Sequence, residues 1–412
     1  MATEKPSAHL QARAQQSIAM TQAPDILVFC DYYLPGYKAG GPVRTLSNMI
    51  DLLGDRYEFN VITRDRDLGE EEPYGNDYTA ARTLIGKALV TFLPPSRQSF
   101  SAIAKEMRSL RHDLLYLNSF FSINFSIKPL LLRRIGLVPE KPVILAPRGE
   151  FSAAAMNIRG LKKRIFIFAA RIAGSHKKVV WQASSDYEAE DIRRHWGADA
   201  RIIVASDLSA AASAAMPGNR SAKVPGCLHA VFLSRISEMK HLDFALRLLD
   251  GLRGQVSIDI YGPIEDSRYW KGCQGIIELL PDNINVRYCG EIPNEQVNHV
   301  LSRYDLFLLP TRGENFGHAI FEALSSGCPV LISDMTPWRD LDTLGIGWDV
   351  PLESPALFKE IIQECIDMDD KTLMQISTRA QAYAASPERQ RTAIEMNCAL
   401  FDSVLESADN GC

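Results

Sequence analysis

From Asp25 onward, short runs rich in β-branched and aromatic residues alternate with segments of helical periodicity along nearly the whole chain. This alternation is typical of parallel sheets covered by helices, because a parallel strand needs a crossover, usually helical, to return the chain to the same edge. The sequence therefore predicts an α/β fold. In the first half we predict a helix at Gly41–Leu53 and strands at Ile26–Cys30, Phe59–Thr63, Val90–Leu93, Leu114–Asn118, Val143–Ala146, Val179–Gln182 and Ile202–Ala205.

The pattern breaks at residues 209–226, SAAASAAMPGNRSAKVPG, which are rich in Ala, Ser, Gly and Pro and have no apolar periodicity. Such a composition predicts a linker. The alternation then resumes, with strands predicted at Ala230–Leu233, Val256–Tyr261, Val286–Cys289, Leu306–Leu309 and Val330–Ile332. The helices predicted in this half are Leu242–Leu252, Asn294–Tyr304 and Asn315–Ser326.

These boundaries predict two doubly wound domains in series, at residues 25–208 and 227–386. Residues 1–24 are expected to be a disordered leader, and residues 387–412 a helical segment that packs back on the N-terminal domain. In open α/β sheets, ligands bind outside the carboxyl ends of the strands. Two such domains facing each other would place their strand-end loops across one cleft, which is the expected ligand site.

Charge and hydropathy exclude several classes of protein. The 412 residues carry 45 basic and 50 acidic side chains, a formal charge of −5, so no global positive field is present to hold nucleic acid. No apolar run approaches the roughly 18 residues of a membrane span. The first 24 residues lack the apolar segment of a secretory signal, so a cytoplasmic protein is expected.

The most informative stretch is 306–333, LFLLPTRGENFGHAIFEALSSGCPVLIS, in which a helix is predicted between two strands. Asn315 is expected to cap this helix, Gly317 to allow a close approach to its first turn, and Gly327 to end it. The unpaired backbone N–H groups of a first turn and the positive end of the helix dipole form a suitable seat for a phosphate.

Two carboxylates belong to the same stretch, Glu314 before the helix and Glu322 within it. At 1.5 Å rise per residue they are separated by roughly 12 Å, too far to act as one acid/base couple on a single bond. They would contact different parts of one ligand, and a nucleotide sugar, with hydroxyls at both ends of a diphosphate, has a suitable length. The alternative from spacing alone is that both are solvated surface carboxylates.

Two further segments offer partners for a phosphate. Arg235 follows a predicted strand and Lys240 precedes a helix, so both cations can face the cleft and neutralise a diphosphate, although basic residues near helix starts are common. Gly40 and Gly41 precede the helix at Gly41–Leu53 and can present backbone N–H groups, or form a plain mobile turn. The G-x-G-x-x-G fingerprint of a nicotinamide dinucleotide site is missing.

The stretch GENFGHAIFEALSSGCPVLISDMTPW resembles the signature of the family 4 glycosyltransferases of the GT-B fold, whose E-x7-E motif matches Glu314 and Glu322. LSRISEMKHLDFAL is similar to the family's Arg-x4-Lys segment, IYGP, which contains Gly262, to the next strand end, and YKAGGPVRTL to the first glycine-rich loop. The resemblance extends from about Asp25 to the C-terminal helix. It implies two Rossmann-like domains that face a cleft.

The resemblance also implies the activity: retaining transfer of a hexosyl group from a nucleoside-diphosphate sugar to an acceptor hydroxyl, without metal. By carry-over, Glu314, Arg235 and Lys240 would be catalytic, with Glu314 at the donor hexose and both cations at the diphosphate. Glu322 would bind the ribose. The other donor-binding residues expected are Asn315, Phe316, Gly317, His318, Gly262, Gly40 and Gly41.

The acceptor side is less defined. Many family members have a His at the end of the fourth strand of the first domain, where this chain has Asn118, which cannot act as a base. The departing phosphate oxygen would then take the acceptor's proton. The usual Asn-Gly turn after the last strand of that domain is replaced by ASDLSA at 205–210. Arg148 and Glu150, in a P-R-G-containing stretch similar to that of a subgroup, are candidates for acceptor contacts, or else form an ordinary surface ion pair.

Residues 159–178 place seven basic side chains around an apolar helical core. A basic amphipathic helix is typical of contact with a membrane surface, where a lipid-linked acceptor would be met. A helix packed on its own sheet with solvated lysines explains the pattern equally well. No His/Cys cluster has zinc spacing, and the D-x-D spelling at 65–67 follows an early strand, so neither a metal nor another cofactor is expected.

The sequence thus predicts a cytoplasmic glycosyltransferase, in contact with the inner face of the membrane if the basic helix binds it. Its partners would be a nucleotide sugar and a sugar or lipid-linked sugar acceptor, as in cell-surface polysaccharide or glycolipid assembly. A nucleotide-sugar epimerase of the same fold and a noncatalytic nucleotide-sugar binding protein are the alternatives. A nicotinamide oxidoreductase is disfavoured by the missing fingerprint.

Overall fold

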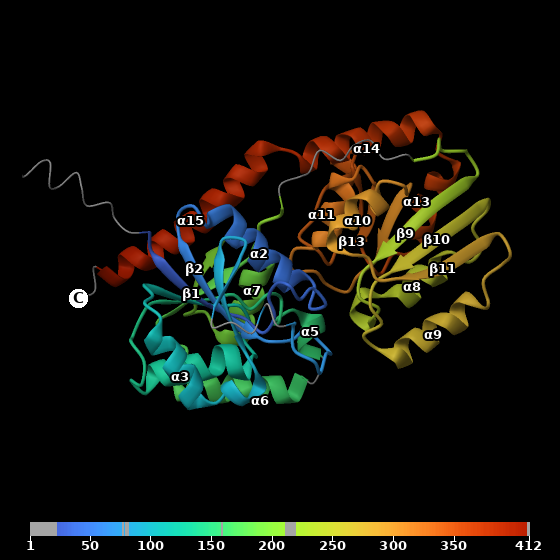
Figure 1. Cartoon of the computed structure of the whole chain (residues 1–412). Coiled ribbons are helices and arrows are strands. Elements are labelled where there is room, and N and C mark those ends of the chain that lie inside the picture. The colour runs from blue at the N-terminus through green and yellow to red at the C-terminus, as the bar shows by residue number, and fades with distance from the viewer. Residues whose placement is uncertain (1–22, 76–77, 79–81, 158–159, 211–219, 410–412) are drawn as a thin grey trace, which may run out of the picture.

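The structure, a computed structural model, describes residues 23–75, 78, 82–157, 160–210 and 220–409. It contains two α/β domains, each built on a largely parallel sheet with helices on both faces (Figure 1). The sheet of the N-terminal domain has the strand order β3-β4-β2-β1-β5-β6-β7-β8, and that of the C-terminal domain has the order β11-β10-β9-β12-β13-β14. The predicted fold class, two doubly wound Rossmann-like domains, is confirmed.

The N-terminal domain is composed of short elements. Its strands are β1 (Asp25–Phe29), β2 (Glu58–Arg64), β3 (Thr83–Ile85), β4 (Ala88–Leu93), β5 (Leu114–Leu117), β6 (Val143–Leu145), β7 (Val179–Ala183) and β8 (Arg201–Val204). Its helices are α2 (Gly41–Leu53), α3 (Phe100–Ser109), α4 (Lys128–Arg134), α5 (Ala153–Asn157), α6 (Gly160–Ala173) and α7 (Asp186–Trp196), with short helical turns η2 (Pro95–Arg97) and η3 (Ile123–Ile127).

The C-terminal domain repeats the arrangement. Its strands are β9 (Cys227–Leu233), β10 (Gln255–Tyr261), β11 (Ile284–Gly290), β12 (Leu306–Leu309), β13 (Val330–Ser333) and β14 (Gly347–Val350). The helices that follow are η4 (Glu238–Lys240), α8 (Leu242–Leu248), α9 (Ser267–Ile277), α10 (Asn294–Leu301), α11 (His318–Ser325), α12 (Leu341–Leu344), α13 (Pro355–Asp367), α14 (Asp370–Ala384) and α15 (Pro387–Asp409).

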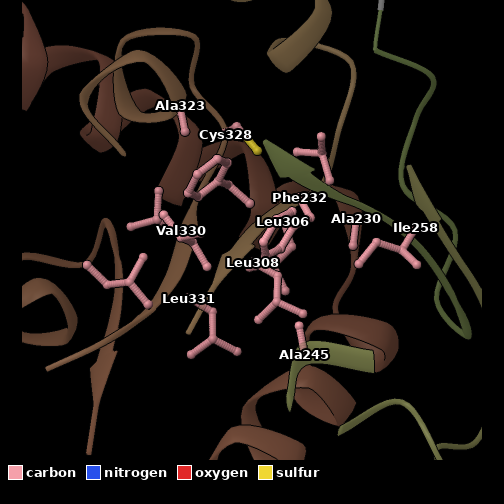
Figure 2. Close-up of a cluster of buried hydrophobic side chains, with 14 of the residues drawn as sticks. Ala230, Phe232, Ala245, Ile258, Leu306, Leu308, Ala323, Cys328, Val330 and Leu331 are labelled. Carbon is pink, nitrogen blue, oxygen red and sulfur yellow. The ribbon is translucent and has the colours of Figure 1, made fainter. Parts of the chain in front are cut away.

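The strands are largely buried on both faces, which explains why apolar runs in the sequence located most of them. The central strand β9 pairs in parallel with β10 and β12, and its residues Ala230 and Phe232 are buried. Figure 2 shows them in one cluster with residues of β12 and β13. Ala245 of α8 and Ala323 of α11 belong to the same cluster, which therefore joins the sheet to its covering helices. A parallel strand covered on both sides must be apolar throughout, which gives a continuous signal in the sequence.

The strands that the sequence prediction missed lie at the sheet edges. β3 is three residues long, pairs antiparallel with β4 and leaves Leu84 exposed, so it lacks a buried apolar run. β14, with the sequence GWDV, contains a glycine and an acidic residue. Of the predicted linker at 209–226, residues 211–219 lie outside the described part of the chain, as do residues 1–22 of the predicted leader.

The last helix, α15, leaves the C-terminal domain and lies along the N-terminal domain (Figure 1). Its buried Leu400, Phe401 and Val404 belong to the same apolar cluster as residues of α2 and β2. The Tyr57 hydroxyl donates to the Asp402 carboxylate at 2.7 Å. In the described part of the chain, no helix is both long and apolar enough to cross a membrane.

Candidate active site

A cavity of about 690 Å³ opens between the two domains, at the carboxyl ends of their strands. The N-terminal domain contributes the start of α2, the loop after β6 and the start of α7. The C-terminal domain contributes the loops after β9, β10, β12 and β13 and the beginning of α11. The facing strand ends of the two sheets therefore form one ligand-sized pocket, at the position where doubly wound domains commonly bind ligands.

The N-terminus of α11 faces this cavity but does not begin where the sequence predicted. The helix starts at His318, and Gly317, with φ of 82°, occupies the N-cap position without a side-chain cap. Among the described residues, the backbone N–H groups of His318 and Ala319 have no hydrogen-bond acceptor, and both residues line the cavity. The first turn thus presents free donors to any anion bound there.

The prediction that Asn315 caps α11 is wrong, because its side chain crosses to the N-terminal domain. The Asn315 amide donates to Asp207 at 3.3 Å, and its oxygen accepts from the Ser184 hydroxyl at 3.0 Å. The Asn315 side chain therefore bonds these two partners instead of the backbone N–H groups of the first turn of α11. Phe316 lines the cavity beside it and packs against Trp338, whose indole N–H donates to the Phe316 carbonyl.

Lys240 and Glu314 form an ion pair in the wall of the cavity, with the ammonium 2.5 Å from a carboxylate oxygen. Their side chains are only 11% and 14% exposed. Lys240 ends η4, just before α8, and Glu314 precedes α11, so two separate strand-end loops bring the pair together. An ammonium has three N–H donors, so Lys240 can hold Glu314 and a ligand phosphate at once.

Arg235 lies after β9 and lines the same cavity, where its guanidinium is 3.0 Å from the half-exposed Glu265 carboxylate.

Gly262 forms the neighbouring part of the cavity wall. A Cβ at Gly262 would lie 1.9 Å from the Ser234 carbonyl oxygen, and its φ of 130° also disfavours a side chain. The Gly262 amide donates to the Gly290 carbonyl, so this glycine permits a close approach of two loops and offers no free donor.

Glu322 of α11 forms an ion pair with Arg44, which lies on the opposite side of the cleft. The Arg44 guanidinium of α2 donates to one Glu322 carboxylate oxygen and also to the Asn294 side chain. The other oxygen is buried and has no hydrogen-bond partner among the described residues. Burial raises the pKa of Glu322, and the charge of Arg44 opposes that rise. A buried acceptor without a partner at the edge of a cavity is a position that a ligand hydroxyl can fill.

His318 also contacts the N-terminal domain. Its Nε2 is 2.8 Å from the Thr45 hydroxyl, which in turn donates to Asp207 at 3.0 Å. Burial lowers the pKa of His318 to about 3, and the positive charges of Arg44 and Arg148 act in the same direction. The imidazole is therefore neutral at physiological pH and acts as a hydrogen-bonding group between the domains.

The glycine-rich loop before α2 has one free donor rather than two. The Gly40 amide donates to the Tyr37 carbonyl at 2.9 Å, so it is not free for a ligand. The Gly41 amide has no acceptor among the described residues, and both glycines line the cavity. The Asp67 carboxylate holds this loop by accepting from the amides of Tyr37 and Lys38.

Arg148 and Glu150 do not pair with each other on the surface, contrary to one of the two expectations. Arg148 is buried, and its guanidinium donates to Asp207, Asn118 and Tyr116. All of its donor groups thus point into the domain, although the residue borders the cavity. Asn118, which occupies the position of the family's His on the acceptor side, lines neither of these two cavities and accepts a hydrogen bond from Arg148.

Glu150 is the acceptor-side candidate that remains accessible. Its carboxylate accepts from the Ser119 hydroxyl at 2.8 Å and from the Phe120 amide at 2.6 Å. Burial nevertheless raises the pKa of Glu150 to about 7. Glu150 also lines a second cavity, of about 470 Å³, at the ends of β1, β2 and β5, where Asp31 and Arg64 form an ion pair. It therefore stands between the two cavities.

No group of three or more His, Cys, Asp or Glu side chains in the described residues could hold a metal ion. The acidic residues of the D-x-D spelling have other partners: Asp65 pairs with Arg66 at 2.8 Å, and Asp67 holds the glycine-rich loop.

Sequence reasoning missed Arg44 and Asp207. Arg44 is part of the stretch YKAGGPVRTL, and its position one turn into the helix at Gly41–Leu53 was the available signal. Asp207 follows the last strand of the N-terminal domain and bonds Arg148, Thr45 and Asn315. A carboxylate just after a strand end is a signal, but its partners come from elements 59 to 162 residues away along the chain.

Residues 221–383 match the family model described as glycosyl transferases group 1. This segment contains Arg235, Lys240, Glu314 and Glu322, the predicted donor-side residues. The match covers most of the C-terminal domain and stops before α15. No curated protein matches the chain.

Several solved structures are similar over almost their full length. HepE from Anabaena in complex with UDP and glucose has a TM-score of 0.66 at 18% identity, covering 92% of this chain and 99% of HepE. Sucrose-phosphate synthase from Thermosynechococcus elongatus has a TM-score of 0.69 at 13% identity, covering 94% and 100%. WaaG, a glycosyltransferase involved in lipopolysaccharide biosynthesis, has a TM-score of 0.63 at 13% identity, covering 91% and 99%. The chain has the GT-B fold.

Proposed function

We propose that the protein is a retaining, metal-independent glycosyltransferase of family 4. It moves a hexosyl group from a nucleoside-diphosphate sugar to an acceptor hydroxyl, in the assembly of a cell-surface polysaccharide or glycolipid at the cytoplasmic side of the membrane. The observation that carries the proposal is the cavity between the domains. Its C-terminal wall combines two cations with a helix N-terminus, and this wall lies within the segment that matches glycosyl transferases group 1.

The diphosphate of the donor would bind at Lys240, Arg235 and the first turn of α11. The free amides of His318 and Ala319 supply directed hydrogen bonds, and the two cations supply charge. Arg235 can turn from Glu265 to the ligand because both side chains of that ion pair are partly exposed to solvent, which makes the pair weak. The anion can thus be neutralised by groups that this chain already places in the cavity.

The two glutamates would hold opposite ends of the donor. Glu322 has a buried carboxylate oxygen without a partner, which suits a ribose hydroxyl. Glu314, fixed by Lys240, would accept from a hydroxyl of the hexose. Lys240 pairs with Glu314. If it also binds the diphosphate, as proposed, one side chain would align the sugar and its leaving group.

The chemical step follows from this placement. When the bond between the anomeric carbon and the diphosphate oxygen breaks, negative charge grows on the diphosphate, and Lys240, Arg235 and the α11 amides stabilise it more than in the ground state. The acceptor oxygen forms its bond to the anomeric carbon on the face that the diphosphate leaves. The departing phosphate oxygen takes the acceptor proton, so the anomeric configuration is retained.

The acceptor would approach from the N-terminal domain. Glu150 is accessible in the wall of both cavities, and with its pKa near 7 it can donate or accept a hydrogen bond at neutral pH. We assign it acceptor orientation. Arg148 and Asn118 would support that wall from behind, because their polar groups are satisfied within the domain.

The test is a direct assay of transfer. UDP-glucose is the first donor to try, since HepE is known in complex with it, followed by a panel of other nucleotide sugars and glycoside acceptors. Nuclear magnetic resonance of the product should show a new glycosidic bond with the anomeric configuration of the donor, and EDTA should leave the rate unchanged. An epimerised donor without a glycoside would indicate an epimerase instead. Binding of donors without any turnover would indicate a binding protein.

A further inference from the structure

Helix α6 carries an apolar stripe on the face that points away from its own domain. Leu161, Ile165, Phe168 and Ile172 are 74%, 59%, 66% and 72% exposed. Their spacing of four, three and four residues places them on one side of the helix, within an arc of about 60° at 100° per residue. Four large apolar side chains in a row along a solvent-facing helix form a patch that core packing does not require.

The opposite face of α6 already provides the packing on the domain. Ile167 and Ala170 are buried, and Phe166 packs in the same apolar cluster. The Lys163 ammonium folds inward too, where it donates to the Ala155 carbonyl and lies over the Phe121 ring. The outward stripe is therefore additional to the attachment of α6 to its sheet.

Positive charges border this stripe. On the helical wheel Arg164 and Arg171 lie along one edge and Lys162 along the other, and all three side chains are exposed. Lys177 and Lys178 follow the helix, and the Lys178 ammonium is 3.3 Å from the Glu140 carboxylate. Residues 160–178 contain no acidic residue, although the chain as a whole carries a net charge of −5. The cations are thus concentrated around the apolar face.

We propose that α6 docks the protein on an anionic phospholipid bilayer, with Leu161, Ile165, Phe168 and Ile172 inserted below the headgroups and the flanking cations at the lipid phosphates. An apolar face edged by basic residues matches the interface of such a bilayer in both polarity and charge. Pairing of this face with a second copy of the chain would place its own cationic edges against each other, which disfavours that partner.

The helix also lies close to the acceptor side of the cleft. Phe121, which packs against Phe166 of α6, lines the second cavity beside Glu150. A bilayer on α6 would therefore be near this cavity. The docking proposal itself rests on the helix surface alone and stands whether or not the proposed sugar transfer is correct.

Co-sedimentation of the full-length protein with vesicles tests the proposal. We expect binding to vesicles of phosphatidylcholine with about one third phosphatidylglycerol, much weaker binding to phosphatidylcholine alone, and release as salt is raised from 0.1 M to 0.5 M. The double variant Phe168→Ser/Ile172→Ser should lower the partition coefficient by roughly tenfold or more. Arg164→Gln/Arg171→Gln should lower it about tenfold or more on the anionic vesicles only.

Leu279→Ser is the matched control, because Leu279 is 85% exposed on the other domain and its loss should not change binding. All variants should keep the melting temperature of the wild type, since the substituted side chains are exposed. Failure of the wild-type protein to bind anionic vesicles would overturn the proposal, as would unchanged binding by Phe168→Ser/Ile172→Ser. A dimer in sedimentation velocity that the same double variant dissociates, without vesicle binding, would assign the face to a second copy.

Discussion

Replacing Lys240 with Met removes the ammonium that we place at the diphosphate and keeps most of the side-chain volume. Removing one preorganised transition-state contact typically costs about 10²–10³ in kcat, or roughly 3–4 kcal/mol of activation free energy. The same change leaves Glu314 without its partner at 14% exposure. Two charges about 4 Å apart at an effective dielectric constant near 20 attract by roughly 4 kcal/mol before desolvation, so a net loss of about 1–3 kcal/mol of stability is expected.

The double variant Lys240→Met/Glu314→Gln separates these two effects. Neutralising Glu314 should restore most of the lost stability, measured by urea unfolding, because no unpaired carboxylate remains in the cavity wall. Turnover of the donor should not recover, since the diphosphate still lacks its cation. Measured kcat for Lys240→Met within threefold of wild type, or recovery of turnover in the double variant, would refute the assignment of Lys240 to the leaving group.

Three other predictions concern the cleft and the core. Glu322→Gln should weaken UDP binding about tenfold or more in calorimetry, because a hydrogen bond to a charged acceptor becomes one to a neutral amide; unchanged affinity would mean that the partnerless oxygen is not the ribose site. Gly262→Ala should abolish most turnover and cost about 1–3 kcal/mol in urea unfolding, because its Cβ would meet the Ser234 carbonyl, and wild-type values would contradict this. Burial lowers the pKa of His176 to about 3. Between about pH 6.5 and pH 3 the unfolded chain is therefore protonated at His176 while the folded protein is not, so the free energy of unfolding decreases as pH falls through this range. Relative to wild type, His176→Phe should therefore gain about 2 kcal/mol between pH 7 and pH 5, and a pH-independent difference would show that His176 is not buried in the neutral form.

The sheets could be predicted because their strands are covered on both faces and must be apolar. The helix predicted at Gly41–Leu53 has the same bounds in the structure, since its apolar residues repeat along one face and a glycine stands at each end. The edge strands β3 and β14 were missed because one is too short and the other too polar to give such a signal.

In the N-terminal domain, the sequence predicted only the glycine-rich loop and the stretch with Arg148 and Glu150 among the residues that line the cavity, whereas in the C-terminal domain it predicted the donor-side residues as a set. Glu314, Glu322, Arg235 and Lys240 all belong to a contiguous stretch whose local pattern is informative, and all four line the cavity. The contacts of Arg44, Asp207 and Asn315 depend instead on how the two domains approach each other. Asn315 was predicted from its intrinsic preference for a helix cap, and that preference is overridden by partners on the opposite domain.

The position of α15 makes the two halves of the chain interdependent. The first domain obtains part of its apolar packing from Phe401 and its neighbours, which are synthesised only after the whole C-terminal domain. A fragment ending at residue 208 would leave Tyr57 and Phe59 uncovered, and a fragment starting at residue 220 would carry Phe401 with nothing to bury it. During translation, the N-terminal domain must therefore wait for the synthesis of α15 before its own core is complete.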